Sequence, residues 1–308
     1  MKNKIKDIMR RFVHSSGINN WTRRVSSNYP RIITFHNICE PGEKIPLGLK
    51  TNVFRLMLEY IKKNYYAMKL SDLVSSRAKY GHYPRNAVVI TFDDGFKSFY
   101  YLAWPMLRDF NIPGTVFVVP GLIEKDPRIW WDRFTFGISM PKEIPENYEL
   151  MSWNMLKELS NSKLIEIGGH TLTHPILAHE NSETSWNELY TCRYIIEEKL
   201  KILVQSFSYP NGKPGDYRVD QMEMVRQAGY CCGVATHFGF VTPESHIMAL
   251  PRIGGEHNDI YSFYKYVDGV EHFLRRIFNV NCELCLQKDF EHRIGGNLCK
   301  KRHCFHSW

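Results

Sequence analysis

The stretch Ala87–Gly95, which reads AVVITFDDG, constrains the fold more than any other part of the chain. A short apolar run that is mostly β-branched is typical of a parallel strand buried on both faces. Asp93 and Asp94 follow where this strand would end, and in α/β barrels catalytic groups collect at the C-terminal ends of strands. Two adjacent acids repel each other there unless a cation or a proton shares the site. The structural alternative is that Asp94 caps the next helix while Gly95 forms the turn.

Composition and charge narrow the class of protein. The 308 residues are 44% hydrophobic and 23% charged, which is typical of a globular protein with one large α/β barrel or two small domains. Residues 1–31 hold eight Lys or Arg against one acidic residue, so nearly all of the net charge of +8 lies there. The remainder is close to neutral, which argues against a nucleic-acid-binding protein.

Residues 1–30 form a basic N-terminal segment with apolar residues on one helical face, namely Ile5, Ile8, Met9, Phe12 and Val13. This pattern predicts a helix that lies on an anionic membrane surface. A helix packed on the protein body and a frayed basic tail are the alternatives. The stretch lacks the apolar core of a signal peptide, and no run has the length of a membrane span. We therefore expect a cytoplasmic protein, either free or peripheral to the inner membrane face.

Apolar runs alternate with helical patterns through residues 31–257. We expect strands at 31–38, 87–92, 115–119, 164–169, 205–209, 231–236 and 249–253, and helices at 52–65, 99–110, 153–160, 183–200 and 217–228. Such alternation predicts a parallel sheet, either closed into a barrel or open and doubly wound. Residues 258–308 then form a helical C-terminal extension that contains cysteines.

The sequence His170-Thr-Leu-Thr-His174 directly follows one predicted strand. Histidines four residues apart share a face in a helix or tight turn, so both imidazoles can reach one ion. A divalent metal such as Zn²⁺ accepts two histidine nitrogens and a carboxylate and leaves a position open for water. Two surface histidines near a turn are the alternative.

Together these motifs resemble the polysaccharide deacetylase family, the NodB-homology group of carbohydrate esterases. TFDDG at 91–95, HTLTHP at 170–175 and YPNG at 209–212 occur in the family's order. The resemblance implies an α/β fold, a distorted (β/α)7 barrel. It also implies metal-dependent removal of an N-acetyl or O-acyl group from a sugar of a polysaccharide or glycolipid precursor. The alternative is a catalytically inactive barrel that binds carbohydrate or acts as a scaffold.

The resemblance also implies roles for individual residues. Asp93 would be the general base, and the metal, for which we expect Zn²⁺, would be bound by Asp94, His170 and His174. The ion neutralises one acid, so the other stays ionised and accepts a proton from the attacking water. Backbone N–H groups near the YPNG turn would help to hold the oxyanion. The substrate-binding residues at this turn would be Tyr209, Pro210 and Asn211.

The chain departs from the commonest family pattern at two places. That pattern has an arginine where this chain has Ser208. It also ends a late strand in His-Asp, whereas His257-Asn-Asp259 here has no apolar run before it. An active enzyme would need its catalytic acid and its arginine at other positions, and the missing late histidine would also fit the inactive barrel.

One branch of the family has a permuted order, with a Tyr-His strand before TFDDG and a late Pro-Arg-Ile strand. Phe35-His36 and Pro251-Arg252-Ile253 resemble these two strands. We therefore predict that His36 is the general acid and that Arg252 pairs with Asp93 and keeps it ionised. The alternatives are a hydrogen-bonded histidine at a strand end and a structural salt bridge elsewhere.

Three further residues resemble a loop of this branch, namely Trp130, Trp131 and Asp132. Exposed tryptophans would stack on sugar rings, and aromatic residues buried under the loop would look the same in sequence. His237 also follows a strand and is a weaker candidate for the site.

The C-terminal extension contains a cluster of cysteines with the spacing C-x2-C-x13-C-x4-C, formed by Cys282, Cys285, Cys299 and Cys304. Such a cluster is compatible with a structural zinc site, and free thiols in a basic tail are the alternative. The expected partners of the whole chain are an acylated sugar, an oligosaccharide or a lipid-linked glycan, and not nucleic acid.

Overall fold

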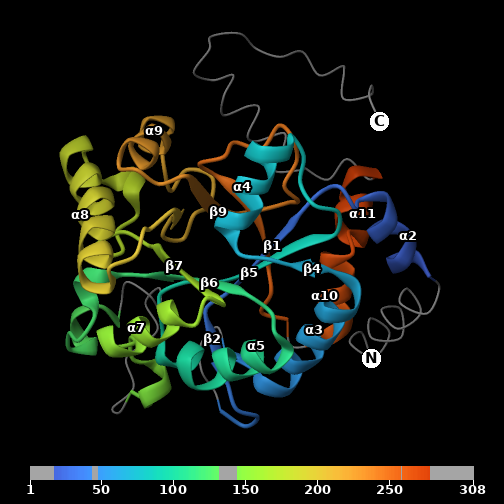
Figure 1. The fold of residues 1–308 in the computed structure, drawn as a ribbon, viewed down its shortest axis with the longest axis horizontal. Helices are drawn as coiled ribbons and strands as arrows, with labels where there is room; N and C mark the ends of the chain where they lie inside the picture. The colour runs from blue at the N-terminus through green and yellow to red at the C-terminus, as the bar shows by residue number, and fades with distance from the viewer. Residues whose placement is uncertain (1–16, 44–47, 132–143, 258, 278–308) are drawn as a thin grey trace.

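Seven parallel strands close into a barrel in the computed structural model, which describes residues 17–43, 48–131, 144–257 and 259–277 (Figure 1). The strands follow the order β1-β10-β9-β8-β7-β6-β5. The pairing of β1 with β5, from Arg31 opposite Val88 to Phe35 opposite Phe92, closes the ring. The structure thus confirms the predicted α/β fold and excludes the open, doubly wound alternative.

The barrel strands are β1 (Arg31–Phe35), β5 (Ala87–Phe92), β6 (Gly114–Val118), β7 (Ile165–Gly169), β8 (Ser206–Ser208), β9 (Cys232–Phe238) and β10 (Leu250–Gly254). The short β4 (Tyr66–Ala67) adds to β5, while β2 (Asn37–Cys39) and β3 (Gly48–Lys50) form a separate parallel pair. The helices are α2 (Ile18–Val25), α3 (Thr51–Asn64), α4 (Leu70–Tyr80), α5 (Trp104–Phe110), α7 (Trp153–Asn161), α8 (Ser182–Leu200), α9 (Val219–Gln227), α10 (Ile260–Val267) and α11 (Val270–Ile277). Among the described residues, no helix combines the length and the apolar character needed to cross a membrane.

The predicted strands correspond to the seven barrel strands, but three details differ from the prediction. The stretch 31–38 divides at His36 into β1 and β2, because the chain leaves the barrel there. The predicted helix 99–110 begins as a π-helical turn, η1 (Phe99–Ala103), before α5. Helix α4 was not predicted, because its sequence is rich in serine and charged residues and buries only Leu70, Leu73 and Val74.

The strands are buried on both faces, which explains their almost continuous apolar sequences. Ala87–Phe92 is buried at all positions, as predicted. One apolar cluster joins Ile32, Val89 and Phe117 of the strands to Leu70 and Leu73 of α4. The larger cluster lies between the opposite strand faces and the surrounding helices. This packing holds the strand ends, and the side chains attached to them, in fixed positions.

Helices α2, α10 and α11 pack together on one side of the barrel (Figure 1). Asp268, which is fully buried at the end of α10, joins them to α3. Its carboxylate accepts hydrogen bonds from Asn19 Nδ2 at 2.9 Å, Tyr60 Oη at 2.5 Å and Tyr65 Oη at 2.6 Å. Residues near both ends of the described chain are therefore tied to the barrel by one buried carboxylate.

Candidate active site

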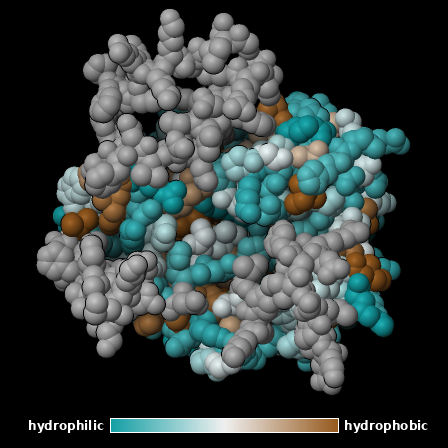
Figure 2. Space-filling model, turned by 180° about the vertical axis from the view of Figure 1, so that it is seen from behind, coloured by the Kyte–Doolittle hydropathy of each residue, from teal (hydrophilic) through white to brown (hydrophobic). Residues whose placement is uncertain are grey.

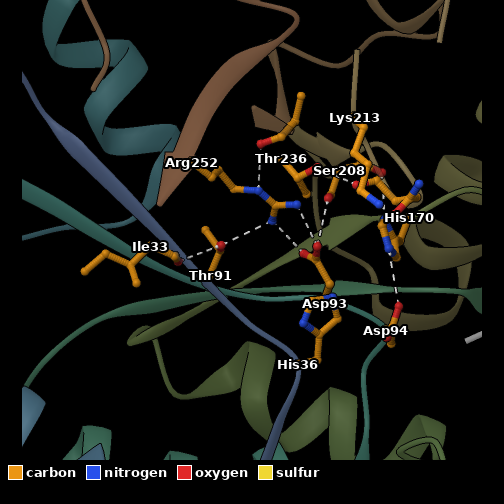
Figure 3. Close-up of polar contacts among 12 residues, drawn as sticks. Ile33, His36, Thr91, Asp93, Asp94, His170, Ser208, Lys213, Thr236 and Arg252 are labelled. Atoms are coloured by element: carbon orange, nitrogen blue, oxygen red, sulfur yellow. Dashed lines mark hydrogen bonds and ion pairs between the residues drawn. The ribbon is translucent and has the colours of Figure 1, made fainter. Parts of the chain in front are cut away.

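The side chains predicted to carry chemistry gather at the C-terminal ends of neighbouring barrel strands (Figure 3). Asp93 and Asp94 follow β5, and His170 follows β7. Arg252 lies on β10, and His36 follows β1. This is the end of a barrel at which α/β enzymes place their active sites.

Asp94, His170 and His174 form a compact cluster of metal-binding groups. The Nε2 atoms of the two histidines each lie 3.4 Å from Oδ1 of Asp94. All three residues are buried, with at most 6% of their surface exposed. One carboxylate oxygen and two imidazole nitrogens within 4.8 Å of one another are a donor set that suits Zn²⁺ or a similar divalent ion. The residues present therefore fit the metal that the sequence predicts.

The backbone around this cluster adopts a conformation that is rare for residues other than glycine. Asp94, Thr171 and His174 all have positive φ angles, of 71°, 63° and 63°. Such backbone costs free energy and persists where the surrounding structure enforces it, often at functional sites. It turns Asp94 and His174 toward His170.

Two further contacts orient the histidines. Nδ1 of His170 donates a hydrogen bond to the carbonyl oxygen of Ser208 at 2.7 Å, and its Nε2 faces Asp94. Glu188 of α8 accepts hydrogen bonds from the backbone N–H and the hydroxyl of Thr173, at 2.8 and 2.7 Å. The turn between the two histidines is thereby fixed to a helix of the outer layer.

The environment also favours the protonation states that bind a metal. Burial alone would raise the pKa of Asp94, but hydrogen bonds from His170 and His174 lower this pKa below its ordinary value. Burial is the main cause that lowers the pKa of His174. A carboxylate and neutral imidazoles are the forms that act as ligands.

Asp93 forms a two-pronged ion pair with Arg252. The two guanidinium nitrogens lie 2.8 and 2.7 Å from the two carboxylate oxygens, and both side chains are at most 3% exposed. Arg252 is itself held by the hydroxyl of Thr91 and the carbonyl oxygen of Ala235. Burial opposes ionisation of Asp93, but the charge of Arg252 lowers its pKa below the ordinary value. The pairing predicted from the sequence is therefore present, and the hydroxyl of Ser208 adds a third hydrogen bond at 3.3 Å.

His36 is paired with Glu256, a residue that the sequence analysis did not identify. Oε1 of Glu256 accepts hydrogen bonds from the backbone N–H of His36 at 2.8 Å and from its Nδ1 at 2.7 Å. Burial opposes the shift, but the charge of Glu256 raises the pKa of His36 to about 9. With this raised pKa the imidazole carries a proton at neutral pH. Its side chain is 23% exposed, so solvent can reach it. Glu256 could have been identified only from the closure of the barrel. Strands β1 and β10 pair with Thr34 opposite Gly254, which brings positions 36 and 256 together.

In the turn after β8, Tyr209 and Pro210 are buried, and only Asn211 is partly exposed to a substrate. The ring of Tyr209 is 1% exposed and stacks on Tyr217 with centroids 4.1 Å apart. Its backbone N–H donates to the carbonyl oxygen of Val234. Pro210 is also buried, whereas Asn211 is partly exposed and has a positive φ of 56°. A direct sugar contact of the Tyr209 ring does not fit this structure, and the oxyanion role of the turn stays a prediction.

The tryptophans of the aromatic loop are interior residues. Trp130 and Trp131 are 1% and 4% exposed, in a cluster with Phe96, Tyr148 and Leu150. The structure therefore corrects the interpretation of these rings as open stacking surfaces and supports the buried alternative, because neighbouring aromatic residues cover them.

Of the remaining residues predicted from the sequence, His237 lies within the described part of the chain and the others lie outside it. His237 is buried and is not part of the Asp94–His170–His174 cluster, and burial, with the charge of Arg252, lowers its pKa to about 4. Asp132 lies outside the described residues, as do the four C-terminal cysteines and residues 1–16. The four cysteines among the described residues are all free thiols.

Known proteins match this chain in sequence and in fold. The family model described as polysaccharide deacetylase matches residues 80–232, which include Asp93, Asp94 and both histidines. The chain belongs to the polysaccharide deacetylase family. Membership agrees with the barrel and with the placement of the metal-binding cluster at the strand ends.

Two curated relatives carry the same description, poly-beta-1,6-N-acetyl-D-glucosamine N-deacetylase. The protein from Staphylococcus aureus (strain MRSA252) is 26% identical over 183 residues, which are 57% of this chain and 56% of that protein. The protein from Escherichia coli (strain K12) is 25% identical over 141 residues, 45% of this chain and 20% of that protein. This chain thus spans about half of the first relative's length and less of the second.

Solved structures of this family share the fold. The Streptococcus pyogenes deacetylase PplD, solved with acetate, superposes with a TM-score of 0.60 at 21% identity, covering 73% of this chain and 92% of that one. IcaB from Ammonifex degensii also has a TM-score of 0.60, at 18% identity, covering 78% and 97% of the two chains. At such identities these likenesses establish the barrel alone.

Proposed function

We propose that this polysaccharide deacetylase family member is a metal-dependent hydrolase that removes N-acetyl groups from a polysaccharide of N-acetylglucosamine. The observation that carries the proposal is the combination, at one end of the barrel, of the Asp94–His170–His174 cluster with the Asp93–Arg252 pair and the His36–Glu256 pair. These are the groups that amide hydrolysis needs: a metal site, a base and an acid. The same combination argues against an inactive, carbohydrate-binding barrel.

Each residue has a separate task in the proposed reaction. A divalent ion held by Asp94, His170 and His174 would polarise the acetyl carbonyl and make a water molecule more acidic. Asp93, kept ionised by Arg252, accepts the proton that this water loses as it attacks the carbonyl carbon. His36, kept protonated by Glu256, donates a proton to the nitrogen as the C–N bond breaks. The products are acetate and a free amine on the sugar.

The substrate class rests on the relatives. Two curated proteins of partial coverage are described as acting on poly-beta-1,6-N-acetyl-D-glucosamine, so this polymer is the first substrate to test. Two other substrates would use the same chemistry. One is a lipid-linked precursor that contains N-acetylglucosamine, and the other is an O-acylated sugar. Zn²⁺ is the metal to supply first, because two imidazoles and one carboxylate suit it.

The test is acetate release by the full chain, loaded with Zn²⁺, from oligomers of β-1,6-linked and β-1,4-linked N-acetylglucosamine. We expect acetate and a matching number of new amines from the β-1,6-linked oligomers, and neither from the His170→Ala variant. Release from the β-1,4-linked oligomers alone would change the assigned linkage. Absence of release from both, with metal bound, would refute the proposed N-deacetylase activity on these polymers.

A further inference from the structure

Helix α2 faces the protein with its polar side and solvent with its apolar side. The residues it buries are Asn19 and Thr22, at 3% and 4% exposed. Its exposed residues include all three large apolar ones, Ile18, Trp21 and Val25, at 41%, 52% and 46%, together with Asn20 and Arg24. A surface helix of a globular protein normally shows the opposite arrangement, because burial of apolar side chains is what attaches it. We call Ile18, Trp21 and Val25 the α2 ridge.

The inward polar face is held by specific partners, so the helix cannot roll over to hide the ridge. Asn19 Nδ2 donates to Asp268 at 2.9 Å. Arg23 donates to Tyr60 Oη at 2.9 Å and lies 3.5 Å from Asp268. Rotation of α2 would break these bonds and leave the buried Asp268 carboxylate short of donors, which is costly. The ridge is therefore fixed outward.

The edge of the ridge contacts α11 without being covered by it. Trp21 meets Phe273 edge to face, with centroids 5.2 Å apart, and still exposes half of its surface. On the face drawn in Figure 2 the described surface is mainly hydrophilic, with small separate apolar patches. Ile18, Trp21 and Val25 form a stripe of three large exposed apolar side chains on this one helix.

Positive charge accompanies the ridge. Arg24 is exposed within α2 itself. The sixteen residues before Gly17 carry one acidic residue, Asp7, and five basic ones, namely Lys2, Lys4, Lys6, Arg10 and Arg11. Apolar side chains that include a tryptophan, combined with adjacent basic residues, are the features that bind a protein to an anionic lipid surface.

We propose that the α2 ridge docks this protein on an anionic membrane surface. The proposal does not depend on the hydrolase activity. Lipid is favoured over another protein as the occupant because the ridge includes a tryptophan, Arg24 is exposed on the same helix, and the sequence before α2 is rich in basic residues. Helix α8 provides a contrast, since its exposed aromatic residues Trp186, Tyr190 and Tyr194 lie on a helix with four acidic and two basic residues.

Co-sedimentation of the full chain with vesicles tests the proposal, using phosphatidylcholine alone and phosphatidylcholine with phosphatidylglycerol. We expect binding only to the vesicles that contain phosphatidylglycerol. The triple variant Ile18→Ser/Trp21→Ser/Val25→Ser should bind about tenfold more weakly or less. The conservative variant Ile18→Leu/Trp21→Phe/Val25→Leu should bind like the wild type. The matched control, Trp186→Ser/Tyr190→Ser/Tyr194→Ser on α8, should also bind like the wild type.

The outcomes separate the possibilities. Equal binding by the wild type and the triple variant, or no binding of the wild type to anionic vesicles, overturns the proposal. A dimer that forms without lipid and is lost in the triple variant assigns the ridge to a second copy and also overturns it. Thermal unfolding of each variant shows whether its fold is intact. If the triple variant does not fold, the double variant Ile18→Ser/Val25→Ser replaces it, because this variant keeps the contact between Trp21 and Phe273. Acetate release from soluble oligomers should be the same in all of them.

Discussion

A single oxygen of Glu256 accepts hydrogen bonds from two groups of His36, its backbone N–H at 2.8 Å and its Nδ1 at 2.7 Å. One contact fixes the backbone where β1 ends, and the other fixes the ring. The same carboxylate supplies the charge that raises the pKa of His36 to about 9. Glu256 therefore sets both the position and the protonation state of the proposed general acid.

The first prediction concerns the pH dependence of activity. Protonated His36 is the active form, so kcat/KM should fall on the alkaline side as pH rises through about 9. In Glu256→Gln the charge is lost, and this limb should move toward the ordinary histidine value of 6.5. At pH 8 the loss should be roughly thirtyfold, because the protonated fraction falls by that factor. Glu244→Gln, at an exposed glutamate, is the control, and an unchanged alkaline limb in Glu256→Gln would remove His36 from the acid role.

The same pair links stability to pH. The pKa of His36 is raised in the folded state, so its contribution is complete below about pH 6.5, the unfolded value. It is lost as pH rises through about 9. The free energy of unfolding, measured by urea titration between pH 6 and 10, should therefore decline more for the wild type than for Glu256→Gln. Parallel curves for the two proteins would show that the pair contributes nothing to stability.

The second prediction separates the base from the metal ligands. Asp93→Asn keeps the shape and can still accept one hydrogen bond from Arg252 through its amide oxygen, but it cannot take up the proton of the attacking water. We expect kcat to fall by about 10²- to 10⁴-fold. The bound metal, measured by mass spectrometry, should remain at the wild-type level. Loss of metal would make Asp93 a ligand, and nearly normal turnover would place the base elsewhere.

Local sequence predicted the parallel strands and the His170–His174 ligand pair because their signals are local, whereas the closed barrel and Asp94 as the third ligand came from the resemblance to the family. A β-branched run such as Ala87–Phe92 is a strand whatever surrounds it, and Asp94, His170 and His174 lie within one or a few residues of strand ends. A barrel brings the C-terminal ends of its parallel strands to one edge, so these residues had to meet there. The strands and the histidine pair could therefore be predicted without any knowledge of packing.

The details that were missed depend on tertiary packing. Glu256 has no motif, and its role arises only because barrel closure sets β10 beside β1. The burial of Trp130 and Trp131 depends on Tyr148 and Leu150, which are distant along the chain. Helix α2 has an outward apolar face because Asp268, about 250 residues later, binds its polar face. None of these relationships leaves a periodic or compositional signal in the sequence.

The third prediction tests the ligand set by metal content. The wild type should hold about one Zn²⁺ per chain, since one Asp-His-His set is present among the described residues. His170→Ala and His174→Ala should each lose this ion, and treatment with a chelator should remove it from the wild type. His237→Ala is the matched control, because His237 is equally buried but is not part of the cluster. If His237→Ala loses the ion and His174→Ala keeps it, the ligand assignment is wrong.

The last prediction concerns the buried carboxylate that joins α2, α3 and α10. Asp268 is fully buried and accepts hydrogen bonds from Asn19, Tyr60 and Tyr65. Asp268→Ala leaves these donors without an acceptor and removes the charge beside Arg23, so the free energy of unfolding should fall by about 2–4 kcal/mol. Asp220→Asn, at an exposed surface pair with Arg218, should change it by less than about 0.5 kcal/mol.

The readout for Asp268→Ala is urea unfolding followed by circular dichroism, together with the metal content of the folded protein. Asp268 lies in the contacts between α2, α3 and α10, whereas the metal cluster lies at the ends of β5 and β7. We therefore expect the less stable variant to bind the metal normally while it is folded. If its stability equals that of the wild type, water must accept hydrogen bonds from the freed donors, and Asp268 would then not be what holds α2 with its apolar ridge outward.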